Sequence, residues 1–266
     1  MNISLITGQL VCRASIGVHM RQICLEDPLN AVRVCTSFAD ELGSMGYEIQ
    51  TGTSLVDLSE LKRSARNEGL SPFFDPEICN LTPDRIFWLS VSSRDGKIAG
   101  LQAFRFDQVE TSLADWGPSY IIGLYMRRQE MLVPTFARPP KGSIAENIRG
   151  RLAYSGEFWV DPQVRNRRFM ECFSRLGIVL SHIKWNLDSV WGICSNRMAV
   201  NGLPNRMGFA HLEKGFLAWQ WSSEGIDPVE WLAISERTSI ERMINETTRN
   251  GDSKSQPEKL QFSEPA

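Results

Sequence analysis

The stretch that decides the fold is RLAYSGEFWVDPQVRNRRFME, residues 151–171. An apolar run typical of a β-strand ends at Val160, Asp161-Pro162 stops it, and an amphipathic helix is expected to begin near Phe169 after three arginines. Unpaired N–H groups and the positive end of the helix dipole attract anions at a helix start, and guanidinium groups add charge-assisted hydrogen bonds. The stretch therefore predicts a phosphate-binding site or, alternatively, a surface helix with three solvated arginines.

The residues before this stretch predict helices, a strand and a hairpin. Apolar spacing predicts helices at 30–42 and 55–68, with a strand at 47–51 between them. Two β-rich runs, 86–91 and 98–104, flank a turn that contains Asp-Gly, which predicts a β-hairpin.

The rest of the chain predicts alternating strands and helices. The expected elements are a strand at 120–126, a proline-rich basic loop at 134–142, a strand at 151–160, a helix at 169–184, a strand at 189–194, a helix or turn within 196–207, and a last strand at 216–221. The order indicates an α/β (α+β) domain with an antiparallel half. Such a sheet binds ligand where neighbouring strands part.

Composition narrows the class of protein. The chain has 266 residues, of which 42% are hydrophobic and 23% charged, as in an ordinary soluble globular protein. A formal net charge of -2 argues against a general polyanion binder, so any basic site must be local. With no recognition-helix or zinc pattern, we expect no binding to duplex nucleic acid.

Cysteine and histidine spacing argue against a metal site. The six cysteines show no C-x-x-C spacing, which is typical of reduced, buried thiols in a cytoplasm, and the three histidines lie far apart. No apolar run reaches the length of a membrane span, and the N-terminus lacks the basic start of a signal peptide. We expect a cytoplasmic protein with no metal and no membrane contact.

Composition also divides the chain into three parts. Residues 1–45 are expected to be an N-terminal extension with a short helix. Residues 46–232 are expected to form the main domain, with an insertion at about 108–150. Residues 233–266 are expected to be a polar C-terminal tail, disordered from about residue 250.

Three features taken together resemble the GNAT acyltransferase superfamily across roughly residues 45–222. They are the hairpin at 86–104, the loop VDPQVRNRRFM at 160–170, which is similar to the family's pyrophosphate loop, and Asn196-Arg197-Met198-Ala199 followed by Asn205-Arg206-Met207-Gly208-Phe209, which resembles its second motif. The resemblance implies a mixed, mostly antiparallel sheet flanked by helices, with splayed central strands.

The resemblance also implies an activity. The chain would transfer an acetyl or other acyl group from acyl-coenzyme A to an amine of a small molecule or peptide, as a monomer or homodimer. The backbone of Asn166, Arg167, Arg168, Phe169 and Met170 would hold the pyrophosphate with Arg165 beside it, Phe158, Trp159 and Val160 would pair with the pantetheine arm, and Asn196 would lie near the pantetheine or acyl end. Glu157 is the candidate base; the alternative is a surface-facing strand carboxylate.

Two departures from the family pattern keep other functions open. Arg168 and Met170 replace both glycines of the pyrophosphate loop, and Leu203 stands where the family usually has the tyrosine that protonates the thiolate. One alternative is a GNAT-like binding or regulatory domain without catalysis. Another is a transferase that takes its acyl group from acyl carrier protein or aminoacyl-tRNA, which the basic residues of the insertion would suit.

Overall fold

A computed structural model describes residues 25, 27–127, 134–136, 139–164, 166–219 and 228–254. These residues form one mixed sheet of eight strands in the order β1-β2-β3-β5-β6-β8-β7-β4. The strands are β1 Tyr47–Gly52, β2 Ile86–Ser93, β3 Ile98–Val109, β4 Pro134–Phe136, β5 Gly150–Val160, β6 Ser189–Cys194, β7 His211–Trp219 and β8 Val229–Glu236. All neighbours are antiparallel except β5 and β6, which are parallel, so the expected fold class is confirmed.

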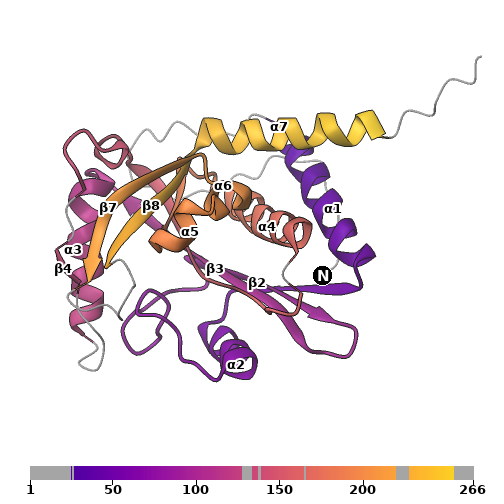
Figure 1. Ribbon diagram of the computed structural model, residues 1–266, viewed down its shortest axis with the longest axis horizontal. Helices are drawn as coiled ribbons and strands as arrows, with labels where there is room; N and C mark the ends of the chain where they lie inside the picture. The colour runs from indigo at the N-terminus through magenta and orange to yellow at the C-terminus, as the bar shows by residue number, and fades with distance from the viewer. Residues whose placement is uncertain are drawn as a thin grey trace, which may run out of the picture.

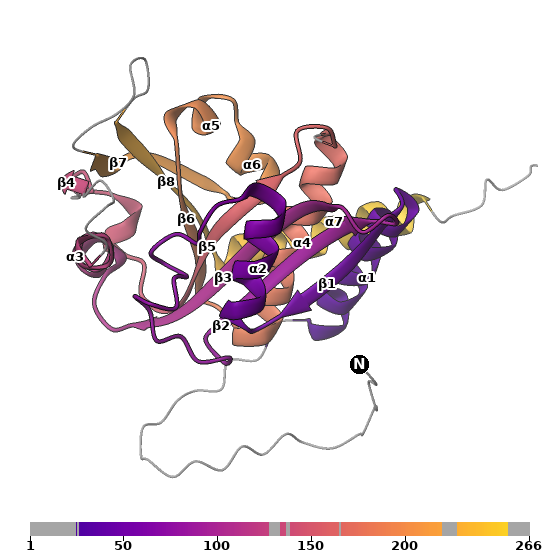
Figure 2. The ribbon, with the colours of Figure 1, turned by 90° about the horizontal axis from the view of Figure 1, so that it is seen from below.

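Helices cover both faces of the sheet. They are α1 Pro28–Ser44, α2 Leu55–Arg66, α3 Leu113–Met126, the 3-10 helix η1 Ile144–Glu146, α4 Arg167–Trp185, α5 Asn196–Val200, α6 Leu203–Met207 and α7 Arg237–Lys254. Figure 1 shows α1, α4 and α7 on one side of the sheet and α2 on the other, and Figure 2 views the α2 side. The core therefore has two parts, one on each face of the sheet.

The strongest sequence patterns give the expected elements. The hairpin of β2 and β3 turns at Gly96, whose φ of 82° favours glycine. Helix α4 buries Phe169, Phe173 and Leu176 on the face that apolar spacing predicts. Its N-cap is Asn166, one turn before that apolar face begins.

The expected strand at 120–126 is wrong, because these residues belong to α3. The Ser112 side chain accepts a hydrogen bond from the Asp115 amide and caps the helix. Leu113, Gly117, Ile121 and Leu124 are buried at helical spacing, which the β-prone composition of the segment concealed.

The C-terminal part is more structured than the sequence analysis expects. Strand β8 ends at Glu236, and α7 continues to Lys254, in a region assigned to a polar tail. Helix α7 is polar but buries Ile240 and Ile244 against the core. Residues 255–266 lie outside the described residues, as do residues 1–24 of the expected N-terminal extension. Helix α1, at the end of that extension, packs on α4.

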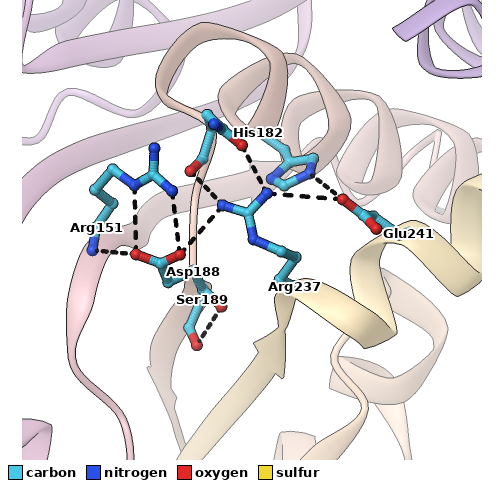
Figure 3. Close-up of polar contacts among 7 residues, drawn as sticks. Arg151, His182, Asp188, Ser189, Arg237 and Glu241 are labelled. Atoms are coloured by element: carbon cyan, nitrogen blue, oxygen red, sulfur yellow. Dashed lines mark hydrogen bonds and ion pairs between the residues drawn. The ribbon is translucent and has the colours of Figure 1, made fainter. Parts of the chain in front are cut away.

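A polar network fastens α7 to the end of α4 and the start of β6 (Figure 3). Arg237 donates to Oδ1 and the backbone carbonyl of Asn186, at 2.6 Å each, and to Asp188 Oδ1 at 3.2 Å. Asp188 also accepts from the backbone N–H and the guanidinium of Arg151. The network therefore joins three segments that are distant in sequence: the start of β5, the connection between α4 and β6, and the start of α7.

His182 of α4 lies at the edge of this network and should make stability depend on pH. Its side chain is fully buried, Nε2 lies 3.6 Å from Glu241 Oε1, and neither ring nitrogen has a hydrogen-bond partner. Burial, together with the charges of Arg237 and Arg151 and against the opposing charge of Asp188, lowers the pKa of His182 to about 4.

Because the pKa of His182 is lower in the folded state, protons bind the unfolded state more tightly. We expect stability to be greatest above about pH 6.5, the unfolded pKa, and to fall by up to roughly 3 kcal/mol as the pH decreases towards 4. Urea unfolding of His182→Gln should lack this decrease, whereas His211→Gln, at an exposed position, should retain it. Equal pH dependence in the wild type and His182→Gln would contradict the assignment.

Candidate functional site

The central strands β5 and β6 are joined at one end and part at the other. Their parallel pairing covers only Leu152–Tyr154 of β5. Beyond it, the two backbones are still close at Ser155 and Gly192. A Cβ built at Gly192 would lie 3.0 Å from the carbonyl oxygen of Ser155. From there on, β6 still pairs with β8 and β5 still pairs with β3, but β5 and β6 no longer pair with each other. The expected splaying of the central strands is thus confirmed, and the gap lies beside Phe158, Trp159 and Val160.

A bulge in β5 begins where the strands part. The register with β3 shifts between Leu101 and Ala103, so that two residues of β5, between Gly156 and Trp159, oppose a single residue of β3. Glu157 adopts a left-handed φ of 52° there, a conformation that residues other than glycine adopt at a cost. The plain alternation that the sequence analysis assumed for Glu157 therefore does not hold.

The Glu157 carboxylate is held rather than free. It accepts a hydrogen bond from Lys62 Nζ of α2 at 2.5 Å and another from the Ser71 amide at 2.8 Å, and its side chain is 1% exposed. Neither partner could be predicted from local sequence patterns, because Lys62 and Ser71 are distant from Glu157 along the chain. The carboxylate anchors the bulge of β5 to α2 and to the loop that follows α2.

The start of α4 leaves two backbone donors for a ligand. Asn166 Oδ1 accepts from the Phe169 amide at 2.7 Å, and the Asn166 carbonyl accepts from the Met170 amide at 3.2 Å. The Asn166 amide itself donates to Val164 O. Among the described residues, the amides of Arg167 and Arg168 have no hydrogen-bond partner. Of the five expected pyrophosphate donors, these two are the available ones.

The side chains that replace the loop glycines have partners away from the start of α4. The Arg168 guanidinium forms a two-point ion pair with Glu41 of α1, and this hydrogen-bonded pairing raises the pKa of Arg168. Met170 packs against the core on the α1 and α4 face. Arg167 pairs with Glu171 at 2.9 Å and is 79% exposed, so it can turn to an anion at low cost. Arg165 lies outside the described residues.

Asn196 lies on the β6 side of the gap. It follows Ser195, the N-cap of α5, directly after β6 ends. Its Oδ1 accepts a hydrogen bond from Trp231 Nε1 of β8 at 3.0 Å. The structure therefore places Asn196 across the gap from the end of β5, with its carbonyl oxygen already engaged.

Tyr154 is a residue of this region that sequence reasoning missed. It is the last β5 residue paired with β6, on the sheet face covered by α2 and α3, and it is 8% exposed. Burial raises its pKa well above the usual value for tyrosine, and the nearby Tyr125, Glu230 and Glu157 raise it further. No local pattern marks Tyr154, because the groups around it come from distant parts of the chain.

The described residues contain neither a metal-binding cluster nor a membrane-spanning helix. In the described ranges, no three or more His, Cys, Asp or Glu side chains come together in a way that could hold a metal ion. No helix among these residues combines the length and apolar character needed to cross a membrane.

The strand order, the single parallel pair and the parting of that pair agree with the GNAT-like fold that the sequence predicts. No protein-family profile matches the chain, and no curated protein matches it. Among solved structures, it is similar to Arabidopsis thaliana NAA60 in complex with acetyl-CoA, at 15% identity over 71% of this chain and 98% of that one, with a TM-score of 0.43. It is also similar to spermidine/spermine N-acetyltransferase SpeG from Vibrio cholerae, at 11% identity over 75% and 97%, with a TM-score of 0.44.

A GNAT-family acetyltransferase from Streptococcus pneumoniae is similar at 13% identity over 71% of this chain and 99% of that one, with a TM-score of 0.39. Identities and TM-scores this low carry no information about activity. The fold class rests on the strand order and register described above.

Proposed function

We propose that this protein is an N-acyltransferase that uses acetyl-coenzyme A or another acyl-coenzyme A to acylate an amine of a small molecule or peptide. One observation carries the proposal: the gap between β5 and β6 opens beside a helix start at which two backbone amides have no partner among the described residues. A diphosphate suits the positive end of α4, and an extended amide-containing arm suits an unpaired strand edge.

The proposed chemistry is direct attack by the amine on the thioester. The amides of Arg167 and Arg168 bind the diphosphate, and the exposed Arg167 guanidinium adds a charge-assisted hydrogen bond. The edge at Phe158–Val160 pairs with the pantetheine arm and fixes the thioester between β5 and β6. Positioning then supplies much of the rate, because a bimolecular reaction becomes effectively unimolecular.

We propose that Glu157 acts on this reaction by holding the bulge. A carboxylate bonded to Lys62 and to the Ser71 amide is already neutralised by its partners, and it is shielded from an incoming amine. A role for Glu157 as base, the candidate role named from the sequence, would require the ion pair with Lys62 to open.

A coenzyme-binding domain without catalysis is the second candidate. The engaged Glu157 carboxylate, together with Leu203 at the position of the family's acid, favours it. Turnover separates the two: release of free thiol from acetyl-coenzyme A with a broad panel of amines supports the transferase. Binding of acetyl-coenzyme A without thiol release from any amine supports the non-catalytic domain.

Isothermal titration with acetyl-coenzyme A tests the binding proposal. We expect saturable binding to the wild-type protein, weakened about tenfold in Arg167→Ala because a charge-assisted hydrogen bond to phosphate is lost. Arg33→Ala removes an arginine of α1 that bonds only to Asn30 of its own helix, and it should bind as the wild type does. Absence of binding at high micromolar protein, or equal weakening in both variants, would contradict the proposed site.

A further inference from the structure

Packing fixes the ring of Tyr154 on the α2 and α3 face of the gap. The ring stacks on Phe73 with centroids 3.9 Å apart and an interplanar angle of 12°. It meets Trp191 of β6 edge-on at 4.9 Å. Aromatic contacts on two sides hold the ring in one orientation at the point where β5 and β6 separate.

Gly156 shows which way the ring leans. A Cβ built on Gly156 would lie 2.7 Å from Tyr154 Cε1 and 2.8 Å from Phe74 Cε2, closer than real Cβ contacts. The Tyr154 ring therefore lies over Gly156 and leans along β5 towards the bulge. Glycine at 156 leaves the space that this orientation needs.

The Tyr154 hydroxyl group is an available donor. No hydrogen bond joins this hydroxyl to another residue in the described part of the chain. Burial, with the nearby Tyr125, Glu230 and Glu157, raises the pKa of the phenol, so it remains protonated over the whole pH range in which a transferase would be assayed. A phenol held protonated in this way can donate a hydrogen bond to a developing anion without losing its proton.

We propose that Tyr154 is a catalytic residue whose hydroxyl donates a hydrogen bond to the carbonyl oxygen of an acyl group held between β5 and β6. This inference rests on the proposed function. The amine nitrogen forms a bond to the carbonyl carbon, and the C=O π pair moves onto the oxygen, which the hydroxyl stabilises. The pair then returns, the C–S bond breaks, and the sulfur leaves with the bonding pair. The proton lost by nitrogen ends on the thiolate, and Tyr154 keeps its own proton throughout.

Tyr154→Phe tests the assignment, because it removes the hydroxyl and keeps the ring that stacks on Phe73. We expect kcat for thiol release to fall about 10²-fold while the Kd for acetyl-coenzyme A is unchanged. The decrease in kcat should be the same for acyl thioesters whose leaving thiol is strongly acidic and for those whose leaving thiol is weakly acidic. The pH profile of kcat should keep its shape. Tyr120→Phe, a matched change on α3 where the ring stacks on Trp116, should leave kcat unchanged.

Gly156→Ala provides a second variant that keeps the hydroxyl but displaces the ring, and it should lower kcat in the same way. Full activity in Tyr154→Phe would overturn the inference, as would a loss confined to donors with poorly acidic leaving thiols, because that result would assign the hydroxyl to the sulfur. A wild-type protein that neither binds acetyl-coenzyme A nor releases thiol would instead reject the proposed function.

Discussion

Arg237→Ala is expected to lower the free energy of unfolding by about 3 kcal/mol. The Arg237 side chain is 17% exposed and donates to both oxygens of Asn186 and to Asp188. Its loss takes this donor from both Asn186 oxygens, leaves Asp188 with Arg151, and removes the positive charge between Asp188 and Glu241. Urea unfolding followed by far-ultraviolet circular dichroism measures the change.

Two further variants separate the network from a general effect of charge on α7. Arg242→Ala removes an exposed arginine from the same helix and should change stability by less than about 0.5 kcal/mol. Arg237→Lys keeps the positive charge but loses the planar guanidinium group, so its free energy of unfolding should lie between those of Arg237→Ala and the wild type. If Arg237→Ala unfolds at the same urea concentration as Arg242→Ala, the network does not hold α7.

Glu157→Ala is expected to cost about 3–5 kcal/mol of stability and most of the transfer activity. The change leaves Lys62, whose side chain is 12% exposed, as an uncompensated buried charge, and leaves the Ser71 amide without its acceptor. The residue at 157 then loses the contacts that stabilise its left-handed conformation, so the bulge should rearrange. Unfolding and thiol-release assays measure the two effects.

The double variant Glu157→Gln with Lys62→Met separates a positioning role from a role as base. Glutamine retains an acceptor for Ser71, and methionine removes the buried charge, so the bulge and most of the activity should be preserved. The pH profile of kcat should also keep its shape. A stable double variant without turnover, or with a lost acidic limb in its pH profile, would assign general-base catalysis to Glu157.

Local patterns in the sequence were enough to predict much of the fold. The hairpin and the β5–α4 unit follow from period-2 and period-3.6 spacing together with turn residues. Helix α3 was missed because its β-branched and aromatic residues at 120–126 favour a strand locally. Strand β8 was missed because its partners, β6 and β7, and not its composition, define it.

The site was less predictable than the fold. Residues of the α4 start were found because a strand, a stop and a basic helix start are adjacent in sequence. The partners of Glu157 could not be found in this way, because Lys62 and Ser71 lie 95 and 86 residues away along the chain. Tyr154 depends on Gly156 for its orientation and on the distant Glu230 for its charge environment. Such contacts arise only when the sheet assembles.

A crystal structure of the protein with bound acetyl-coenzyme A is the most direct test of the central claim. The account predicts the diphosphate on the backbone amides of Arg167 and Arg168, and the thioester between the parted ends of β5 and β6 beside Trp159. Coenzyme bound elsewhere, or a helix start that remains empty at saturating acetyl-coenzyme A, would contradict it.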